Sequence, residues 1–253
     1  MRAALALLLA LAAFPCAGET LVTSLSTDRI AITSNFNGAS LVVFGVVERE
    51  ASASPRSGGY DVVVTVRGPR GAVTVREKKR LGPFWLNLDS RQYIAIPAFL
   101  SVAANRPLDE IASQDMRREF LLGVDTQVSA QGDRKRTLDP DEPAFRAALI
   151  RIRKAQGLFT ERSDGVRFLT PTVFRATARI PGTVPLGAYA VDVAVLLDGV
   201  QVAKSRTPFQ VLKSGAEEDI AEAARDRSLI YGLGVVALAL LFGWLATLIF
   251  RRD

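Results

Sequence analysis

The stretch GAYAVDVAVLLDGVQVAKSRTPFQVL, residues 187–212, decides the fold. Within it, residues 189–195 alternate in the way expected of a β-strand with one buried face. Asp198-Gly199 follows, and this dipeptide is a strong signal for a two-residue hairpin turn. Residues 200–204 and 207–212 continue the strand pattern. The stretch therefore predicts an antiparallel hairpin.

Strand patterns recur on both sides of the middle of the chain. The continuous apolar run 40–47 suits a strand buried on both faces. Pro97 places part of 93–102 at a sheet edge or a bulge. Short strands between Gly/Pro turns predict a mainly β fold, with an immunoglobulin-like β-sandwich as the exported domain. The predicted strands are residues 29–33, 40–47, 60–66, 73–79 and 84–88, the stretch 93–102, and the return over 166–180.

Helical spacing replaces the strand pattern between residues 106 and 157. Pro107 and the acidic residues after it predict one helix start. Residues 139–142 predict a second start, with Asp139 as the N-cap, and Gly157 ends that helix. The polar residues 125–137 predict a loop. The segment is either a helical insert in one composite β domain, which we favour, or the joint between two β-sandwiches.

Both ends of the chain carry apolar segments. Residues 1–18 have the charged, apolar and small-residue order of a secretory signal peptide. A lipoprotein acylated at Cys16 and an uncleaved anchor are the alternatives. Residues 229–250 contain no charged side chain and are long enough to cross a bilayer as a helix. Arg251 and Arg252 then place the C-terminus in the cytoplasm, so we expect a single-pass bacterial inner-membrane protein with its bulk in the periplasm.

These patterns divide the chain into seven expected segments. A tail as short as 251–253 leaves no room for a cytoplasmic signalling domain. The expected segments are a signal peptide (1–18), a first β-sandwich segment (19–105), the helical insert or joint (106–157), a second β-sandwich segment (158–212), a juxtamembrane helix (213–228), the transmembrane helix (229–250) and the cytoplasmic tail (251–253).

Composition excludes several kinds of chemistry. The chain has no histidine, which removes Ser-His-Asp and Cys-His catalysis and His-based metal sites. Its one cysteine, Cys16, lies in the predicted signal peptide, so we expect no thiol chemistry and no disulfide in the exported domain. We expect no cofactor and no metal. The net charge of +6 could reflect an anion-binding or phospholipid-facing surface, but arginines on solvated faces are the favoured explanation, and no nucleic-acid recognition motif is present.

Two groups of residues are candidates for binding. Arg134, Lys135 and Arg136 in the predicted loop, with Arg151 and Lys154 on the following helix, could bind an anion or lipid headgroups. The alternative is that these cations form solvated faces.

The second group lies in the predicted span. Ala239, Gly243 and Thr247 repeat at four-residue spacing, which lets two helices approach closely. The alternative is a helix that faces only lipid.

Several strings together resemble the alphaproteobacterial putative transmembrane protein family over nearly the whole mature chain. The resemblance implies no established activity, and it suggests an integral-membrane partner such as a sulfite-exporter-like permease. The strings are Asp28-Arg29-Ile30-Ala31-Ile32, Phe36-Asn37-Gly38, Phe44-Gly45, Asn105-Arg106-Pro107-Leu108, Gly187-Ala188-Tyr189-Ala190-Val191, Leu229-Ile230-Tyr231-Gly232-Leu233, Gly243-Trp244-Leu245-Ala246 and Phe250-Arg251-Arg252.

These observations favour a non-enzymatic accessory or interaction subunit of an inner-membrane transporter or assembly complex. The alternative is a stand-alone envelope protein that binds an anion or lipid headgroups. Catalysis by paired carboxylates is the remaining enzymatic option. Because every acidic pair stands where a helix start favours negative charge, we assign no catalytic residue. The pairs considered are Asp109 with Glu110, Asp139 and Asp141 with Glu142, and Glu217 and Glu218 with Asp219.

Overall fold

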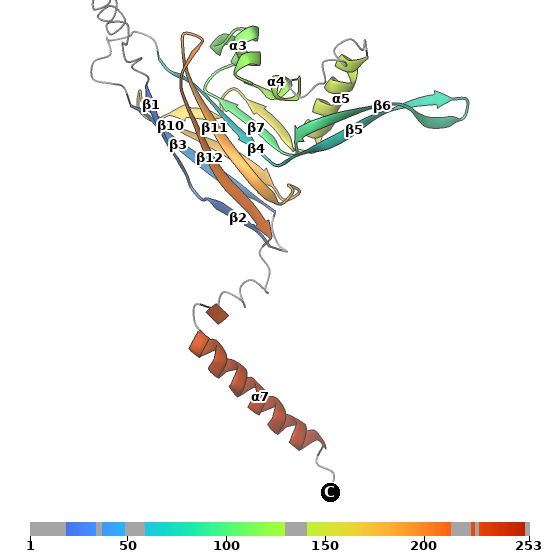
Figure 1. Ribbon diagram of the computed structural model, residues 1–253, viewed down its shortest axis with the longest axis vertical. Helices are drawn as coiled ribbons and strands as arrows, with labels where there is room; N and C mark the ends of the chain where they lie inside the picture. The colour runs from blue at the N-terminus through green and yellow to red at the C-terminus, as the bar shows by residue number, and fades with distance from the viewer. Residues whose placement is uncertain are drawn as a thin grey trace, which may run out of the picture. The chain divides into compact units, whose positions relative to one another are not determined.

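The computed structural model describes residues 19–33, 37–48, 59–129, 141–213, 224–225 and 228–250. They belong to two compact units. The first contains two β-sheets, a long two-stranded arm and several helices, and the second contains helix α7 (Figure 1). The mainly β fold is confirmed. Outside the described residues lie the predicted signal peptide, Asp139, the loop residues Arg134, Lys135 and Arg136, most of the juxtamembrane segment 213–228, and the tail 251–253.

Sheet A is antiparallel and has the strand order β1-β3-β10-β9. Its strands are β1 (Thr20–Leu25), β3 (Gly38–Glu48), β9 (Val166–Phe168) and β10 (Val173–Pro181).

Sheet B has the order β2-β12-β11-β4-β7-β8, with β7 and β8 parallel. Both sheets combine strands that precede the helices with strands that follow them, so the two β segments build one body. The strands of sheet B are β2 (Arg29–Ile32), β4 (Asp61–Arg67), β7 (Leu100–Ala104), β8 (Phe159–Arg162), β11 (Gly187–Leu197) and β12 (Val200–Lys213).

The hairpin predicted from residues 187–212 is confirmed as β11 and β12. Leu197 pairs with Val200 across the turn. Asp198 and Gly199 both have positive φ angles, 49° and 80°, which a type I′ turn requires at its two central positions. A small acidic residue followed by glycine adopts these angles at low cost.

The main core lies where sheet A faces sheet B. Leu41 of β3 and Phe174 of β10 are buried, and Thr23 of β1 bonds Ser205 of β12 between hydroxyls 2.7 Å apart. Gly45 is buried opposite the Phe174 ring, and a Cβ at position 45 would lie 2.0 Å from the ring's Cζ. The absence of a side chain at position 45 therefore makes room for this ring.

The prediction that residues 40–47 are buried on both faces is wrong. β3 alternates, with Phe44 and Val46 exposed, because among the described residues no second layer covers the outer side of sheet A. Strands buried on both faces occur instead in sheet B, where β4 and β7 are examples. One face of these strands turns toward sheet A. The opposite face is the outer face of sheet B, and helices lie over it (Figure 1).

In the described part of the connection between β7 and β8 there are four helices. Ser113 caps α3 by accepting the Met116 N–H, Pro143 stands in the first turn of α5, and Gly157 (φ 69°) ends α5 as predicted. The loop predicted over 125–137 is wrong for residues 125–129, which belong to α4. The helices are α2 (Leu108–Ile111), α3 (Gln114–Glu119), α4 (Val124–Ser129) and α5 (Glu142–Ala155).

The start of α4 depends on a distant strand. The Glu161 carboxylate of β8 accepts the Val124 N–H at 2.8 Å, and the Thr126 hydroxyl bonds the Leu122 carbonyl. An acidic group at a helix N-terminus is favourable. Glu161 lies 37 residues further along the chain, so local composition around residues 125–129 could not indicate this helix.

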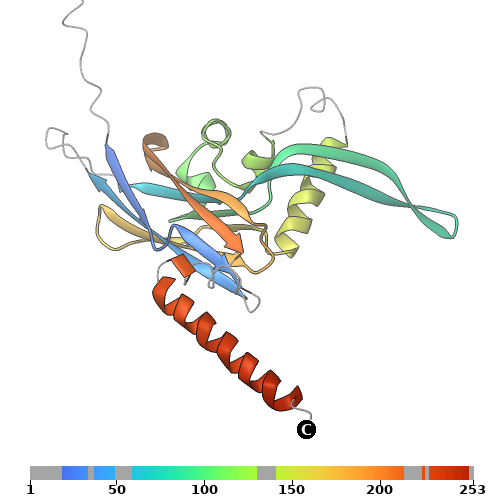
Figure 2. The ribbon, with the colours of Figure 1, turned by 60° about the horizontal axis from the view of Figure 1, so that its bottom comes forward.

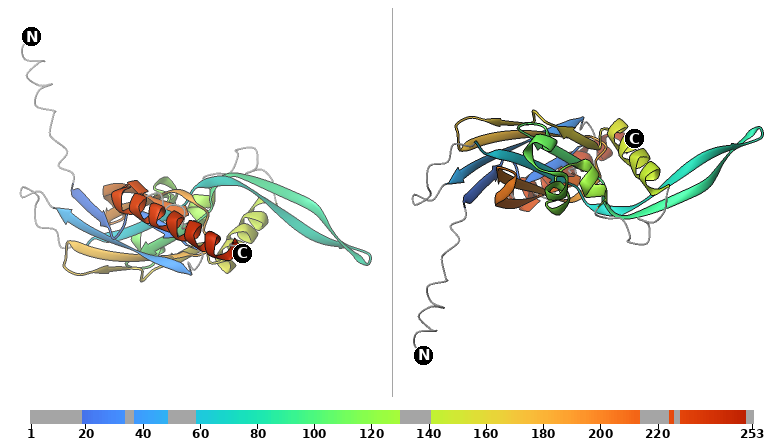
Figure 3. Two further views of the ribbon diagram at one scale, coloured as in Figure 1. Left: turned by 90° about the horizontal axis from the view of Figure 1, so that it is seen from below. Right: turned by 90° about the horizontal axis from the view of Figure 1, so that it is seen from above.

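The arm is a hairpin of β5 (Arg70–Leu81) and β6 (Phe84–Pro97), and it extends well beyond the sheets (Figures 2 and 3). The strands predicted over 73–79 and 84–88 are too short, and β6 joins 84–88 to the first residues of the predicted stretch 93–102. Gly82, with φ 63°, and Pro83 make a two-residue turn, in which a first central residue of positive φ suits type II′. The irregularity predicted around Pro97 is confirmed, because Ala95 has φ 57° and the pairing shifts its register nearby.

Helix α7 covers Ser228–Phe250 and contains no charged residue. Its side chains are described for residues 228–229 and 231–247. Over the stretches of chain that are described, no helix combines the length and apolar character needed to cross a membrane. The span over 229–250 stays a prediction from the sequence.

Tyr189, near the start of β11, anchors one end of the core. Its ring lies 6.2 Å from Phe99 and 5.2 Å from Phe209 between centroids. Its hydroxyl donates to the carbonyl of Pro185, four residues upstream, at 2.7 Å. Burial raises the pKa of Tyr189 from 10.0 to about 12. The phenol therefore stays neutral at ordinary pH. It links the segment before β11 to the aromatic side chains of the core.

Replacing Gly45 by alanine should lower stability, because the new Cβ overlaps the Phe174 ring. We expect a loss of about 1–3 kcal/mol, measured as the melting temperature of the full chain in mild detergent. Gly71→Ala is the matched strand control, since a Cβ there meets nothing within 4 Å. Adding Phe174→Leu to Gly45→Ala should restore some of the loss. Equal melting temperatures for the two glycine variants would contradict this packing.

Stability should fall at high pH through Tyr189. Its folded pKa is higher than its unfolded pKa, so the stabilisation is present below about pH 10 and is lost as the pH rises toward about 12. The urea midpoint should therefore fall more between about pH 9 and pH 11 in the native chain than in Tyr189→Phe. The variant should begin about 1 kcal/mol less stable because it lacks the bond to Pro185. Tyr231→Phe serves as the control, and an identical pH response in Tyr189→Phe and the native chain would refute the assignment.

Candidate functional site

A pocket of about 180 Å³ lies on the outer face of sheet B, between the sheet and the α3–α4 segment. Phe120, Leu121 and Leu122 line its helical side, together with Gln127 of α4. We call it the basic pocket, because four cations and one carboxylate line it. These charged residues are Arg67, Arg70, Lys204, Arg206 and Asp192.

Strand register brings these side chains together. Asp192 of β11 pairs with Thr65 of β4 on one side and with Arg206 of β12 on the other. Paired residues of adjacent strands share a face, and so do residues two positions apart on one strand. Arg67, two positions after Thr65, and Lys204, two before Arg206, therefore lie on the same face. The sheet itself thus concentrates positive charge at this point.

Asp192 is shared by two arginines. It forms an ion pair with Arg67, and its Oδ1 accepts from Arg206 Nε at 2.7 Å. The side chains of Arg67 and Asp192 are each 11% exposed, so this pair is nearly removed from water. Arg67 Nη1 also donates to Gln127 Oε1 at 3.3 Å, which ties the sheet to α4. Desolvated charges need such partners, so we read the Arg67–Asp192 pair as structural.

The remaining cations give the pocket its surplus charge. Arg206 is 59% exposed on its side chain, and Arg70 and Lys204 form no ion pair with any described residue. One carboxylate cannot neutralise four cations. A small oxyanion would supply the missing negative charge and accept hydrogen bonds from guanidinium groups.

The helical wall of the pocket has an unusual backbone. Leu121 has φ 54°, a left-handed conformation in which glycine is the usual residue. The Leu122 N–H bonds the Arg117 carbonyl at 2.8 Å, and the Leu121 N–H bonds the Arg118 carbonyl, which together form a Schellman helix end after α3. Leucine at this position costs roughly 1 kcal/mol, and its apolar side chain lines the pocket.

The anion-binding residues predicted from sequence lie elsewhere. Arg151 and Lys154 are exposed on α5. Arg151 lines a separate groove of about 350 Å³ between α5 and β5, where cations and carboxylates are mixed, and Lys154 lines neither cavity. The structure therefore does not bring these two residues to the basic pocket, and the loop Arg134, Lys135 and Arg136 is outside the described residues.

Asn105 and Arg106, which carry some of the family resemblance, form a structural clamp. Arg106 Nε donates to Asp61 Oδ1 at 2.6 Å and its Nη2 to Oδ2 at 2.5 Å. Asn105 Nδ2 donates to the same carboxylate, and Asn105 Oδ1 accepts the Val62 N–H. Asp61 is 4% exposed, and its hydrogen bond raises the pKa of Arg106 further above its ordinary value. This clamp closes the end of β4 against the segment before α2.

The carboxylates considered for catalysis have structural surroundings where they are described. Asp109 and Glu110 are exposed in the first turn of α2. Glu142 is buried, accepts from the Tyr93 hydroxyl at 3.4 Å and pairs with Arg146. Within the described ranges, no group of three or more Asp, Glu, His or Cys side chains could hold a metal ion.

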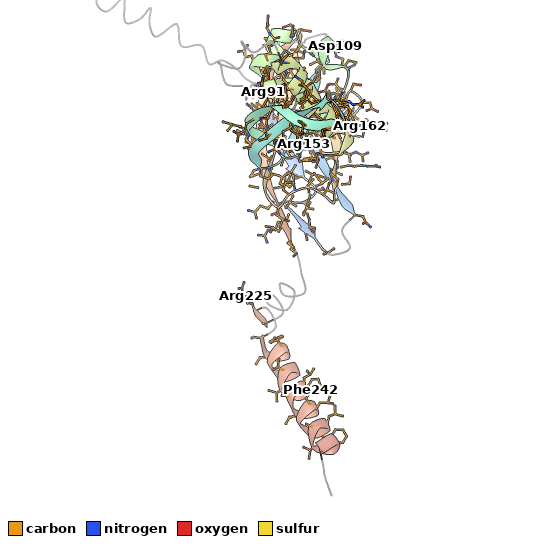
Figure 4. All side chains as sticks on the ribbon, turned by 90° about the vertical axis from the view of Figure 1, so that its right-hand side faces the viewer. Arg91, Asp109, Arg153, Arg162, Arg225 and Phe242 are labelled. Atoms are coloured by element: carbon orange, nitrogen blue, oxygen red, sulfur yellow. The ribbon has the colours of Figure 1, made fainter. Side chains whose placement is uncertain are left out.

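The small residues of α7 lie on its exposed surface. Thr247 turns its hydroxyl back to the Gly243 carbonyl, 2.8 Å away, so this polar group is satisfied within the helix. Ala239 and Gly243 are exposed. Apolar side chains such as Phe242 project from the helix (Figure 4).

Comparison with known proteins identifies one relationship. No curated protein and no solved structure matches this chain. A family model described as "Putative transmembrane protein (Alph_Pro_TM)" matches residues 20–252, which is nearly the whole chain. The description names a transmembrane protein and gives no activity. The chain belongs to this alphaproteobacterial family of transmembrane proteins of unknown function.

Proposed function

We propose that this protein is a single-pass inner-membrane protein whose exported β body binds a partner without catalysing a reaction. In this proposal it serves as an accessory subunit of an inner-membrane transporter or assembly complex. The observation that carries the proposal is the surface of α7. Leu233 and Leu240 are 72% and 71% exposed, and apolar side chains are exposed along the described length of the helix. Such a surface needs lipid or a partner helix around it.

The sequence supports the direction of insertion. Arg251 and Arg252 follow the apolar segment, and residues 1–18 have the order of a signal peptide. In this arrangement both sheets, the arm and helices α2–α5 stand in the periplasm. A periplasmic body is then available to an integral-membrane partner, and a sulfite-exporter-like permease is our candidate.

We further infer that the β body is an immunoglobulin-like sandwich. Two sheets face each other, and strands from both halves of the chain contribute to each. The bond from the Tyr189 hydroxyl to the Pro185 carbonyl resembles a tyrosine corner, in which a tyrosine near a strand start bonds the backbone a few residues upstream. Sandwiches of this class host many unrelated functions, so this likeness is one of fold alone.

The accessory role predicts a co-purifying integral-membrane partner. The full chain, extracted in mild detergent and captured by an affinity tag, should bring down one membrane protein in near-stoichiometric amount. Gly243→Leu should weaken that capture if the small-residue stripe packs against the partner's helix, because bulk at this position separates the helices. Gly234→Leu, on the same helix outside the stripe, is the matched control. A chain that stays monomeric and without a partner under mild extraction would contradict the role.

A second function, binding of a small oxyanion, is favoured by the surplus cations of the basic pocket. Sulfate, sulfite or phosphate should raise the melting temperature of the full chain by a few degrees at about ten times its Kd, where linkage gives about 1.4 kcal/mol. Lys204→Gln and Arg70→Gln should reduce this shift, since each removes a cation that lines the pocket.

Two controls separate site binding from general charge screening. Sodium chloride of equal ionic strength should not reproduce the shift. Arg179→Gln, at an exposed arginine of β10 remote from this pocket in the strand order, should leave the shift unchanged. Equal shifts for all three variants would exclude the basic pocket as an anion site.

A further inference from the structure

The outer portion of the arm is uncovered, in contrast to its base. At the base, the Arg91 guanidinium lies 4.9 Å from the centre of the Phe145 ring of α5, and the Tyr93 hydroxyl donates to Glu142. Further out, every residue from 78 to 88 is exposed, and of these Lys78, at the inner end, also lines the groove between α5 and β5. We call residues 78–88 the arm tip. It is two strands thick, and an isolated two-stranded hairpin is at best marginally stable in water.

The arm tip ends in large apolar side chains. Leu81 and Phe84 flank the Gly82-Pro83 turn and are 62% and 68% exposed, and the adjacent Trp85 is 65% exposed. Aromatic side chains are seldom so exposed on the surface of a soluble protein unless they bind something. Because the turn fixes their position at the extreme end of the arm, these groups are the first portion of it to reach any surface.

Cations stand directly behind the apolar end. Arg80 pairs across the hairpin with Trp85, Lys79 with Leu86, and Lys78 with Asn87. Paired residues share a face, so Lys79 lies on one face of the arm and Lys78 and Arg80 on the other.

Only one of these three charges is balanced within the arm. Lys79 Nζ lies 2.7 Å from Asp89 and 3.3 Å from Glu77, and the bond to Asp89 is the main cause that raises its pKa. Lys78 and Arg80 form no ion pair with any residue that the structure describes. Arg80 Nε donates only to the Gly82 carbonyl, at 2.9 Å. Arg80 therefore adjoins the apolar end, whereas Lys78 lies two residues further back, next to Glu77.

This order matches the layers of a bilayer surface. The three residue pairs from Leu81–Phe84 back to Lys79–Leu86 extend about 7–10 Å at roughly 3.4 Å per pair. Amphipathic segments insert to about 5–10 Å, with tryptophan at the headgroups and Lys or Arg beside the phosphates. A protein groove would need acidic groups matched to two separate faces of the arm. A bilayer presents negative charge all around an inserted tip, which favours a lipid surface as the occupant.

We propose that the arm tip inserts into the headgroup region of an anionic bilayer. Leu81, Phe84 and Trp85 enter the boundary with the acyl chains, and Lys78 and Arg80 pair with lipid phosphates. Glu77 and Asp89 stay outside, where repulsion from the phosphates limits the depth of insertion. The proposal rests on the membrane location proposed above, but it concerns a contact separate from that of α7.

The two tryptophans of the chain allow a direct test, because Trp85 reports on the arm and Trp244 on α7. Trp244→Phe leaves Trp85 as the only tryptophan, and Trp85→Phe leaves Trp244. Each full-length variant is reconstituted in vesicles of phosphatidylcholine with or without phosphatidylglycerol, and fluorescence is measured with and without brominated acyl chains. Trp85 should be blue-shifted and quenched in the anionic vesicles and much less so in the zwitterionic ones. Trp244 should be quenched in both.

A charge variant tests the cations separately. Lys78→Gln and Arg80→Gln, added to the Trp244→Phe chain, should each lower the inserted population about fivefold in anionic vesicles. Lys204→Gln is the matched control, since Lys204 lies on β12 and not on the arm.

The outcomes distinguish the two proposals. Quenching of Trp85 that depends on anionic lipid and on both cations supports insertion of the arm tip, whether or not Trp244 is quenched. An unquenched Trp85 beside a quenched Trp244 overturns it, leaves the anchor intact and points to a protein as the arm's partner. If neither tryptophan is quenched, both the arm contact and the proposed anchor are wrong.

Discussion

Sheet B buries both faces of its central strands, and this constraint governs where polar groups can lie. Every residue of β4 from Asp61 to Val66 is buried, so a charged group on this strand needs a partner within the protein. Asp61 has Arg106 and Asn105, and Arg67 at the strand's end has Asp192 and Gln127. These partners fix the helical segment against the sheet. The clamp at one end of β4 and the basic pocket at the other both arise because a charged group on a buried strand needs a partner within the protein.

The charged surfaces of the protein therefore differ in origin. In the basic pocket, some of the positive charge is used to hold the fold, since Asp192 is already shared by Arg67 and Arg206. At the arm tip, Lys78 and Arg80 form no ion pair with any described residue, and Arg80 bonds only the Gly82 carbonyl of the turn. A ligand at the pocket would add to an existing network, whereas a surface that meets the arm tip would supply the first counter-charges these two residues have. For this reason the arm tip makes the stronger case for an external contact.

Features that depend on residues close together in the sequence could be predicted, and features that depend on contacts between distant residues could not. The hairpin at Asp198-Gly199 was predictable because the turn and both strands are contiguous, and Gly157 ends α5 for an equally local reason. The arm was underestimated, because five successive charged residues, 76–80, interrupt the alternation by which a strand is recognised. The basic pocket was not predictable, since Arg67 and Asp192 lie 125 residues apart and meet only through strand register. One signal was available: a charged residue within a doubly buried strand, such as Asp192, requires a buried partner somewhere in the chain.

The base of the arm determines what its tip can do. A two-stranded ribbon attached only through a loop would sample many directions, and each contact at its end would carry a large cost in conformational entropy. Here the Arg91–Phe145 contact and the bond from Tyr93 to Glu142 fasten β6 to α5, and α5 contacts β8 of sheet B. The direction in which the arm leaves the β body is thereby set by the packed core. An arm held in this way presents Phe84 and Trp85 at a fixed distance from the sheets, so that binding at the tip also positions the β body relative to whatever the tip contacts.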